Sequence, residues 1–400
     1  MTTLLLGLVA AVMLGIAGWM LYQAFRKRTL RPIPDAQGRM TPPEPVRVGP
    51  PPARAAILLS AAAMLALLAF FGRHVVHAFY ARTEVAARIT PATTQRLSSS
   101  SGAQLAVAHY GTKDGPVVVL THGWGADRRD WAYLLAALPK SYHVVLWDLP
   151  GLGESSPTSG MEYSMATLAK DLDTVVSNVS SKPVVLVGHS VGGILNLEYA
   201  RRYPEKVGRE VVAIVQVNTT FTNPIETKKN PELSRMLQKP LFEPLLHLVS
   251  ATAPVARGLG WLAYQSGMAH IQLASQSFAG MESWGQLDEM ARYAYRSSPK
   301  VVAKGVMGML RWDGSNVLPQ IAVPTLVIAG AQDTTTLPMA SERMARDIPQ
   351  AEMVTVQGAA HLGPVERADQ YAQLISRFVD QVSLNAVPRS VASGGVIGHE

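Results

Sequence analysis

From residue 105 onward the chain alternates short, apolar, β-branched runs with helical stretches, and this alternation restricts the folds open to it. A run that is apolar at every position suits a strand buried on both faces, as in a parallel sheet covered by helices. Helical patterns at 165–179 and 191–203 lie between such runs. The order predicts a doubly wound, mostly parallel α/β sheet. The apolar runs lie at 117–120, 143–147, 184–187, 211–217, 325–328 and 353–356.

One long interval interrupts this alternation. Residues 219–320 contain no evident strand and are rich in Leu, Met, Ala and aromatic side chains. A structureless loop of about a hundred residues is rare inside a compact domain, so a helical insertion is the better interpretation. We therefore expect one α/β core built from 97–218 and 321–385, a helical cap at 219–320, and a disordered tail at 386–400.

An uncharged apolar segment opens the chain at residues 4–25. As a helix its 22 residues would span roughly 33 Å, enough for a hydrocarbon core of about 30 Å. Trp19 and Tyr22 stand near its end, where interfacial aromatic residues are common. A cleaved signal peptide is the alternative, but it would need a basic start and a small-residue cleavage site. We expect a transmembrane helix at 1–25.

A second apolar run covers residues 55–71, with Ser60 as its single polar member. Phe79 and Tyr80 follow it as candidate interfacial residues, and Arg73 could extend its side chain toward the headgroups. This pattern predicts a second transmembrane helix at 55–80. The run is short for a span, so a buried amphipathic or re-entrant helix is the alternative.

The positive charge of the chain is concentrated between these two segments. The formal net charge is +7, and the stretch from Arg26 to Arg54 holds seven basic and two acidic residues, which is 7 − 2 = +5. The rest is close to neutral, so the charge does not indicate a nucleic-acid partner. Abundant proline makes 26–54 an extended connector. The positive-inside rule then places this loop in the cytoplasm and the remaining chain outside, although four later arginines oppose that orientation: Arg73, Arg82, Arg88 and Arg96.

The complete absence of cysteine excludes several classes of protein. A small secreted domain held by disulfides needs cysteine, as does a thiolate metal site or a cysteine nucleophile. The sequence shows no motif for a metal or an organic cofactor, and we expect neither.

The strongest chemical signal follows the apolar run at 184–187. Gly188-His189-Ser190-Val191-Gly192 is a G-x-S-x-G sequence that opens a predicted helix. A strand-to-helix turn this tight forces the serine into a strained backbone conformation, and small residues two positions away on either side avoid clashes. The hydroxyl is thereby lifted above the sheet, at a helix N-terminus that favours negative charge. Ser190 is the candidate nucleophile.

A serine hydroxyl needs a base, and chain order points to His361. His361 directly follows the last apolar run, and Asp333 follows the run at 325–328. Carboxyl ends of parallel strands are where ligands bind in such sheets. The order serine, aspartate, histidine is the one expected for this architecture. Asp333 would fix the imidazole tautomer and stabilise the imidazolium.

Two backbone N–H groups are expected to stabilise the oxyanion. Val191, directly after the nucleophile, supplies one of them. The other should come from the loop after an early strand, where His122-Gly123-Trp124-Gly125 allows a sharp turn, so Trp124 is the second candidate. The Trp124 indole could also line an acyl pocket. His122 would order this loop by hydrogen bonding, with a catalytic role as the alternative.

Together these motifs resemble the α/β-hydrolase superfamily, in its lipase, esterase and peroxidase-like branch. The similarity extends from about residue 97 to 382 and includes the motifs HGWG (122–125), DLPGLGES (148–155), GHSVGG (188–193), VPTLVIAGAQD (323–333) and GAAHLGPVE (358–366). The superfamily places a helical cap where residues 219–320 fall, and its acid and histidine loops match those of Asp333 and His361. The sequence Gly151-Leu152-Gly153 lacks the third glycine of a dinucleotide-binding fingerprint, since position 156 is a serine, so Asp148 is interpreted as structural. Epoxide hydrolases and haloalkane dehalogenases of this superfamily use an aspartate where this chain has Ser190, so their chemistry is not expected.

These inferences predict a membrane-anchored, multi-pass serine hydrolase that cleaves carboxylic esters, lipid-like or acyl esters above all, on the extracytoplasmic side. Its expected partners are an ester substrate and the membrane, and the sequence leaves the oligomeric state open. A cofactor-free perhydrolase or a C–C bond hydrolase would keep the same triad. A catalytically silent, membrane-tethered binding module is the alternative from another functional class.

Overall fold

The computed structural model describes residues 2–25, 28–29, 45–46, 52–85, 90–227 and 230–386. The predicted connector at 26–54 and the predicted tail lie mostly outside these residues, apart from a short antiparallel pair, β1 (Arg28–Thr29) and β2 (Pro45–Val46). The chain divides into two units. We call Ala86–Ser250, Gln276–Glu282 and Lys300–Glu400 the sheet unit, and Met1–Val85, Ala251–Ser275 and Ser283–Pro299 the helical unit.

The described part of the sheet unit contains one eight-stranded sheet. Its strands are β3 (Thr93–Ser98), β4 (Gln104–Gly111), β5 (Val117–Thr121), β6 (His143–Trp147), β7 (Val184–His189), β8 (Val211–Val217), β9 (Thr325–Gly330) and β10 (Ala351–Val356). They are ordered β10-β9-β8-β7-β5-β6-β4-β3. Neighbours from β10 to β6 are parallel, while β4 is antiparallel to both β6 and β3. The predicted, mostly parallel sheet is therefore confirmed.

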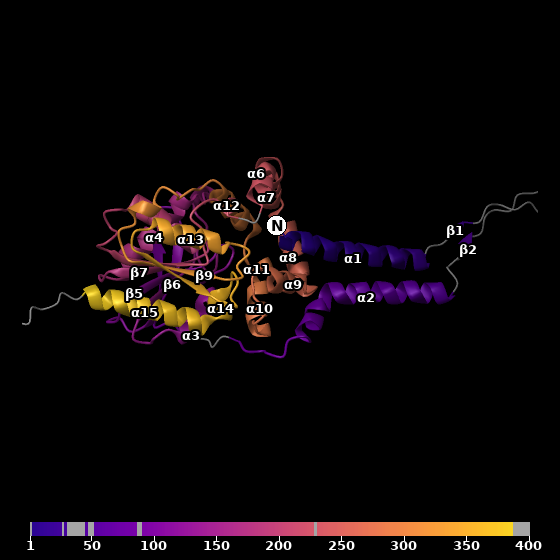
Figure 1. Ribbon diagram of the computed structural model, residues 1–400. Helices are drawn as coiled ribbons and strands as arrows, with labels where there is room; N and C mark the ends of the chain where they lie inside the picture. Colours follow the sequence, from indigo (N-terminus) through magenta and orange to yellow (C-terminus); the bar gives the residue numbers. More distant parts are fainter. Residues whose placement is uncertain are drawn as a thin grey trace, which may run out of the picture. The chain divides into compact units, whose positions relative to one another are not determined.

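Helices cover both faces of this sheet (Figure 1). One face carries α3 (Ala132–Ala137) and α15 (Ala368–Ala386), and the other carries α4 (Met165–Val179), α5 (Val191–Arg202) and α13 (Pro338–Asp347). Strand β5 shows why both faces of the sheet are covered. Its side chains at 117–120 are apolar, and successive side chains of a strand point to opposite faces. Val118 joins the core under α3 and α15, whereas Val119 joins the core on the other side. Short helical turns complete the loops: η1 (Arg128–Trp131), η2 (Ser159–Met161), η4 (Leu318–Gln320) and α14 (Gly363–Glu366).

Sequence analysis did not identify the two antiparallel strands. Alternate residues of β3 are exposed, and β4 ends in half-buried and exposed residues. Neither strand therefore forms an uninterrupted apolar run of the kind that marks strands buried on both faces. The position of β3 at the edge of the sheet explains its exposed residues, because an edge strand has water on one side, and β4 lies next to it.

The chain between β8 and β9 is helical and contributes to both units. In the sheet unit lie α6 (Pro231–Leu237), the π-helical turn η3 (Gln238–Phe242), α7 (Glu243–Ala251) and α12 (Pro299–Leu310). In the helical unit lie α8 (Ala253–Gln265), α9 (Met268–Gln276), α10 (Trp284–Ala291) and α11 (Tyr293–Arg296). No strand of the sheet occurs among the described residues of this interval. The boundaries of a separate cap at 219–320 remain a prediction.

The helical unit also contains the two apolar segments found at the start of the chain. They form α1 (Thr2–Phe25) and α2 (Pro52–His77), which lie side by side (Figure 1). Among the described residues, Ala55–His77 is the one helical stretch long and apolar enough to cross a membrane, and Leu6–Tyr22 of α1 is apolar but shorter. An anchor of two spans therefore remains a hypothesis.

Candidate active site

Strand order creates a crevice at the point where the predicted serine lies. After β5 the chain continues to β6 on one side, and it later returns to form β7 on the other side of β5. Connections that leave in opposite directions open a crevice above the carboxyl ends of such strands. Ser190 follows β7, and Gly123 follows β5. A Cβ atom placed on Gly123 would lie 3.6 Å from the Ser190 Cβ atom, so the two loops meet there.

Ser190 has the strained backbone expected of a sharp strand-to-helix turn. Its φ and ψ angles are 53° and −118°, and α5 begins at the next residue. The neighbouring strand holds this conformation. The Ser190 N–H group donates to the Val217 carbonyl at 3.0 Å, and the Thr219 hydroxyl donates to the Ser190 carbonyl at 2.5 Å. Such strain persists only where its surroundings enforce it, and here β8 does so.

The glycines on either side of this turn allow the backbone to approach closely. A Cβ atom on Gly188 would lie 2.3 Å from the Gly192 carbonyl carbon, and one on Gly192 would lie 2.3 Å from the Thr121 carbonyl oxygen. Both distances are too short for non-bonded atoms. Side chains at these positions would therefore displace the turn, which explains the G-x-S-x-G spacing.

Asp333 and His361 are in direct contact at the neighbouring strand ends. The His361 Nδ1 atom lies 2.9 Å from the Asp333 Oδ2 atom, and both side chains are buried. The other oxygen of Asp333 accepts the N–H groups of Thr335 and Thr336, each at 2.8 Å. Burial alone would raise the pKa of Asp333, but His361 and the hydrogen bonds lower it below its usual range. The carboxylate therefore stays ionised at neutral pH.

His361 also lies near the serine turn, although it does not yet bond to the hydroxyl. Its ring centroid is 5.0 Å from that of His189, the residue before Ser190. Within the described part of the chain, no hydrogen bond links the Ser190 side chain to His361. Catalytic hydrogen bonds are often long in ligand-free enzymes and shorten when substrate binds.

Two residues that sequence analysis did not select hold the His361 loop in place. The His189 Nε2 atom lies 2.9 Å from the His361 carbonyl oxygen. The Asn218 side-chain amide donates to the carbonyls of Ala360 and His361, at 2.6 and 3.0 Å. Its oxygen accepts the Gly330 N–H group at 3.0 Å, which ties the ends of β8 and β9 to the same loop. Asn218 is a polar residue directly after the apolar run at 211–217, and this position is the signal by which the sequence could have identified it.

Sequence analysis predicts the N–H groups of Trp124 and Val191 as oxyanion donors, and this prediction concerns two groups near the serine turn. Val191 is the first residue of α5, so its N–H group has no partner within the helix. Neither it nor the Trp124 N–H group donates to another residue in the described ranges. The Trp124 indole has a different role, because it donates to the Val302 carbonyl of α12 at 2.9 Å. That bond fixes the loop beneath α12.

Hydrogen bonds of His122 hold the loop that carries Trp124. The Leu149 N–H group donates to the His122 Nε2 atom at 3.0 Å, so the proton is on Nδ1, which donates to the Gly123 carbonyl at 2.8 Å. Burial lowers the pKa of His122 and keeps the ring neutral. Because the backbone engages both ring nitrogens, this conformation leaves none for proton transfer.

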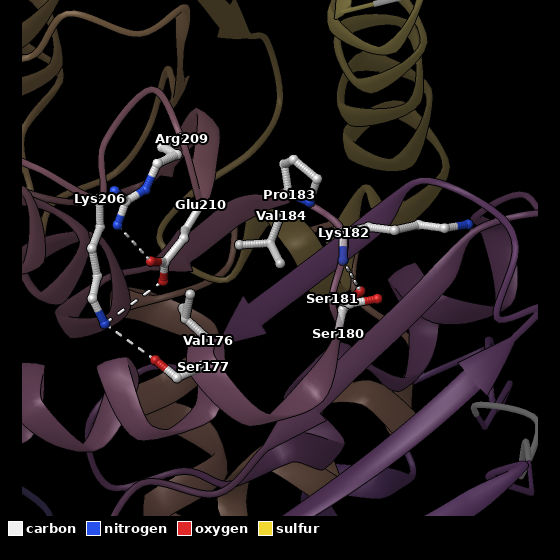
Figure 2. A pocket seen from close by; sticks show the side chains of 10 residues that line it. All are labelled: Val176, Ser177, Ser180, Ser181, Lys182, Pro183, Val184, Lys206, Arg209 and Glu210. Atoms are coloured by element: carbon white, nitrogen blue, oxygen red, sulfur yellow. Dashed lines mark hydrogen bonds and ion pairs between the residues drawn. The ribbon is translucent and has the colours of Figure 1, made fainter.

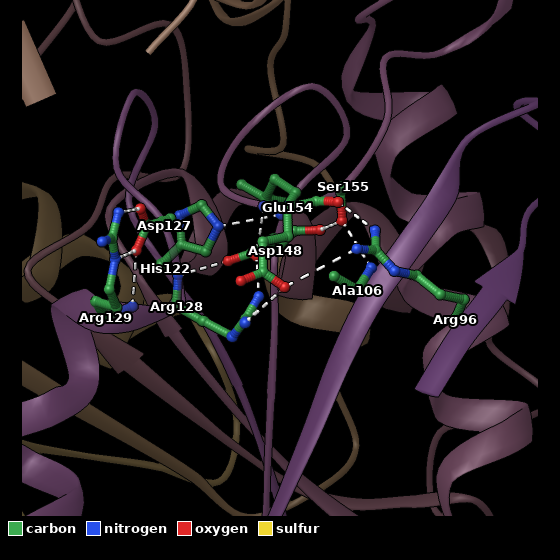
Figure 3. A network of polar contacts seen from close by, with 10 residues as sticks. Arg96, Ala106, His122, Asp127, Arg128, Arg129, Asp148, Glu154 and Ser155 are labelled. Carbon is green, nitrogen blue, oxygen red and sulfur yellow. Dashed lines mark hydrogen bonds and ion pairs between the residues drawn. The ribbon is translucent and has the colours of Figure 1, made fainter. Parts of the chain in front are cut away.

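Asp148, predicted to be structural, anchors the turn that follows β6. One of its oxygens accepts the Arg128 N–H group at 2.7 Å, and the other accepts the Glu154 N–H group at 2.9 Å (Figure 3). The guanidinium group of Arg128 pairs with the same carboxylate. The structural role of Asp148 is therefore confirmed.

A second hollow lies at the opposite end of β7, with a volume of about 450 Å³ (Figure 2). Three of its charged groups are paired, since Lys206 contacts Asp173 and Glu210, and Arg209 contacts Glu210. The fourth, Lys182, donates to the Asp114 carbonyl at 2.7 Å.

The hollow is far along the strand from Ser190. Lys206 donates to the Ser177 hydroxyl at 3.2 Å. Burial alone would lower the pKa of Lys206, but Asp173 and Glu210 raise it, so this amine stays protonated and is no base for the serine. Among the described residues, no group of three or more His, Asp or Glu side chains is placed to hold a metal ion.

Comparisons with known proteins agree with this geometry. Residues 116–368 match the family model described as alpha/beta hydrolase fold. The chain is 27% identical over 283 residues to the magnesium-chelatase 30 kDa subunit of Rhodobacter capsulatus, which covers 68% of this chain and 90% of that protein. It is 25% identical over 266 residues to a pimeloyl-[acyl-carrier protein] methyl ester esterase of Neisseria meningitidis, covering 66% and 94%. A thermophilic esterase from Thermogutta terrifontis superposes with a TM-score of 0.60 at 25% identity, over 73% of this chain and 99% of the esterase.

The turn geometry predicts that Gly192→Ala destabilises the sheet unit. The added methyl group would overlap the Thr121 carbonyl oxygen, so we expect a loss of more than about 1 kcal/mol and a lower thermal midpoint. Thermal unfolding followed by circular dichroism measures this. The control is Gln373→Ala on the exposed side of α15, which should leave the midpoint unchanged. Equal midpoints for the two variants would contradict the proposed close approach.

The burial of His189 predicts a loss of stability in acid. Burial, followed by the proximity of His361, lowers the pKa of His189 from 6.5 to about 3. Below pH 6.5 the unfolded chain therefore binds a proton that the folded chain rejects, and stability falls with falling pH until about pH 3. In His189→Gln, which retains a donor, the thermal midpoint should fall less between pH 7 and pH 4 than in the wild type. His247→Gln, at an exposed position, is the control, and parallel curves for all three proteins would refute the prediction.

Proposed function

The chain belongs to the α/β-hydrolase fold family, and from this premise we propose that it is a serine esterase with Ser190 as nucleophile. The observation that carries the proposal is the buried His361–Asp333 contact of 2.9 Å beside a serine with φ of 53°. Nucleophilic catalysis by serine requires an activating base, and a strained serine at a strand-to-helix turn is typical of the α/β-hydrolase fold. Esterases among the relatives and solved structures described above support the same class of reaction.

In the proposed mechanism, Asp333 fixes the protonation state of His361. The ionised carboxylate accepts the Nδ1–H group, so Nε2 carries the lone pair. When substrate is bound, Nε2 removes the proton from Ser190 as its Oγ atom attacks the ester carbonyl carbon. The resulting imidazolium is stabilised by Asp333 and returns the proton to the departing alkoxide. An acyl-enzyme remains on Ser190, and water releases the acid by the same proton transfers in reverse roles.

The N–H groups of Trp124 and Val191 would stabilise the negative charge of the tetrahedral intermediate. Both are fixed before the reaction, one by the His122 network and the other by the start of α5. Donors that need no rearrangement stabilise a developing oxyanion better than mobile water does. Loss of one such donor typically lowers turnover by a factor of about 10²–10³.

We further propose that α1 and α2 anchor the protein in a membrane. Ala55–His77 meets the length and composition of a span, and the apolar part of α1 lies beside it. The basic stretch between them carries five of the seven net positive charges, which favours a cytoplasmic connector. The hydrolase would then act outside the cytoplasm on esters with an apolar acyl or alcohol part, since an anchored enzyme meets membrane-associated substrates first.

The proposed nucleophile predicts covalent labelling at one residue. A fluorophosphonate probe should label the wild-type protein, and Ser190→Ala should abolish labelling because the attacking oxygen is gone. Gel fluorescence after a brief incubation measures this. Ser297→Ala is the control and should be labelled as the wild type is. A folded wild-type protein that remains unlabelled would favour the binding-module alternative.

The proposed role of Asp333 predicts a large loss of turnover in Asp333→Asn. An amide does not hold the required tautomer or stabilise the imidazolium, so kcat should fall about a thousandfold or more while KM changes little. Hydrolysis of nitrophenyl esters measures both constants. Asp347→Asn, on the surface of α13, is the control. Near-normal turnover in Asp333→Asn would mean that another group orients His361.

A further inference from the structure

The apolar helices α1 and α2 are packed tightly against helix α8. A Cβ atom on Gly7 of α1 would lie 2.0 Å from the Leu259 carbonyl oxygen, and one on Gly72 of α2 would lie 2.4 Å from the Ser266 carbonyl oxygen. Backbones approach this closely only where glycine removes the side chain. The start of α1 therefore meets α8 itself, and the end of α2 meets Ser266, the residue that caps the C-terminal end of α8. The helices α1 and α2 run antiparallel (Figure 1).

A charged cluster fixes this contact at the end of the apolar stretch of α2. The Arg73 guanidinium donates to the Tyr264 hydroxyl at 2.6 Å and lies over the same ring. Tyr264 in turn donates to Asp288 of α10 at 2.9 Å, and the carboxylate also contacts Arg292 and His270. Burial alone would raise the pKa of Asp288, but these hydrogen bonds hold it well below its usual range. A charge near an apolar segment is tolerated when protein groups pair it, as they do here.

Aromatic rings surround the end of α2 at the same level. The Trp284 ring of α10 stacks on His77 of α2 with centroids 4.6 Å apart, and on His270 of α9 at 4.9 Å. Because His77 is the last residue of the apolar stretch, α9 and α10 lie where that stretch ends. Tryptophan, tyrosine and arginine at the end of an apolar helix are typical of a membrane–water boundary.

Helix α8 continues the apolar surface of α2. Val255, Gly258 and Trp261 are exposed and three residues apart, so they share one side of the helix. The Trp261 ring lies 6.0 Å from the ring of Phe70, which is itself exposed on α2. Arg257 is exposed beside them. Ile271 is a further exposed apolar residue on the adjoining helix α9.

We propose that α8 and α9 form a platform that lies in the boundary between the headgroups and acyl chains of a phospholipid bilayer. The proposal rests on the membrane anchoring proposed above and adds that part of the helical interval 219–320 is seated on the lipid. Its grounds are the continuity of the exposed α8 face with α2 and the pairing of Arg73 with Tyr264. A mixed face of tryptophan, arginine and aliphatic side chains suits that boundary better than it suits water. Esters dissolved in the bilayer would then meet the helices of this interval first.

The absence of cysteine allows a direct test with the full-length protein. Single-cysteine variants would be labelled with a small fluorophore and reconstituted into phosphatidylcholine vesicles that carry a nitroxide quencher either near the headgroup or deep in the acyl chains. Gly258→Cys reports on α8 and Gly15→Cys on α1, and at both positions a Cβ atom has no neighbour within 4 Å. Ile271→Cys reports on α9. Leu384→Cys in α15 is the matched apolar control, with an exposure of 75% against 57% for Ile271.

The platform predicts that the shallow nitroxide quenches the Gly258→Cys and Ile271→Cys labels more than the deep one does. The deep nitroxide should quench Gly15→Cys most, and neither should affect Leu384→Cys. If Gly15→Cys is quenched but Gly258→Cys and Ile271→Cys behave as Leu384→Cys does, the anchor stands and the platform is wrong. If Gly15→Cys is not quenched, the proposed anchoring itself fails and the platform fails with it. Gly258→Cys could also be protected from a water-soluble thiol reagent without being quenched by either nitroxide. That result would indicate that a protein partner covers α8, and it would overturn the proposal.

Discussion

The parallel register of β7, β8 and β9 is the constraint on which the candidate site depends. Ser190 keeps its strained backbone because its N–H group reaches the end of β8 at Val217. From the next position along the chain, the Asn218 side chain holds the His361 loop and the end of β9. A shift of one strand by a single residue would break these bonds together. The register of the sheet therefore determines where the loops that carry Ser190, Asp333 and His361 lie relative to one another.

Most of the sheet and the Asp333–His361 pair could be predicted from the sequence because their signals are local. An apolar run marks a strand buried on both faces, and a residue just after such a run lies at the functional edge. The edge strand β3 lacks this signal, since water faces part of it. His189 and Asn218 were missed for another reason. Each is a single common polar residue whose importance comes from a carbonyl more than a hundred residues away.

The packing of α8 against α1 and α2 was equally hidden from the sequence. About 190 residues separate Arg73 from Tyr264, and no periodicity links an arginine near one apolar helix to a tyrosine in another. From hydropathy alone, these first two helices are predicted only as transmembrane helices. The glycine contacts and the Arg73 cluster instead join them to helices inserted between two strands of the hydrolase sheet. The helices α1 and α2 and part of the interval 219–320 thus form one folded unit.

The central claim is that an acyl group is carried on Ser190 during turnover. Acid quenching during hydrolysis of a chromogenic ester, followed by proteolysis and peptide mass spectrometry, tests it most directly. The account predicts that the peptide containing Ser190 gains the mass of the acyl group and loses it when the ester is exhausted. Turnover with no acylated peptide, or with the acyl group on a different residue, would contradict it.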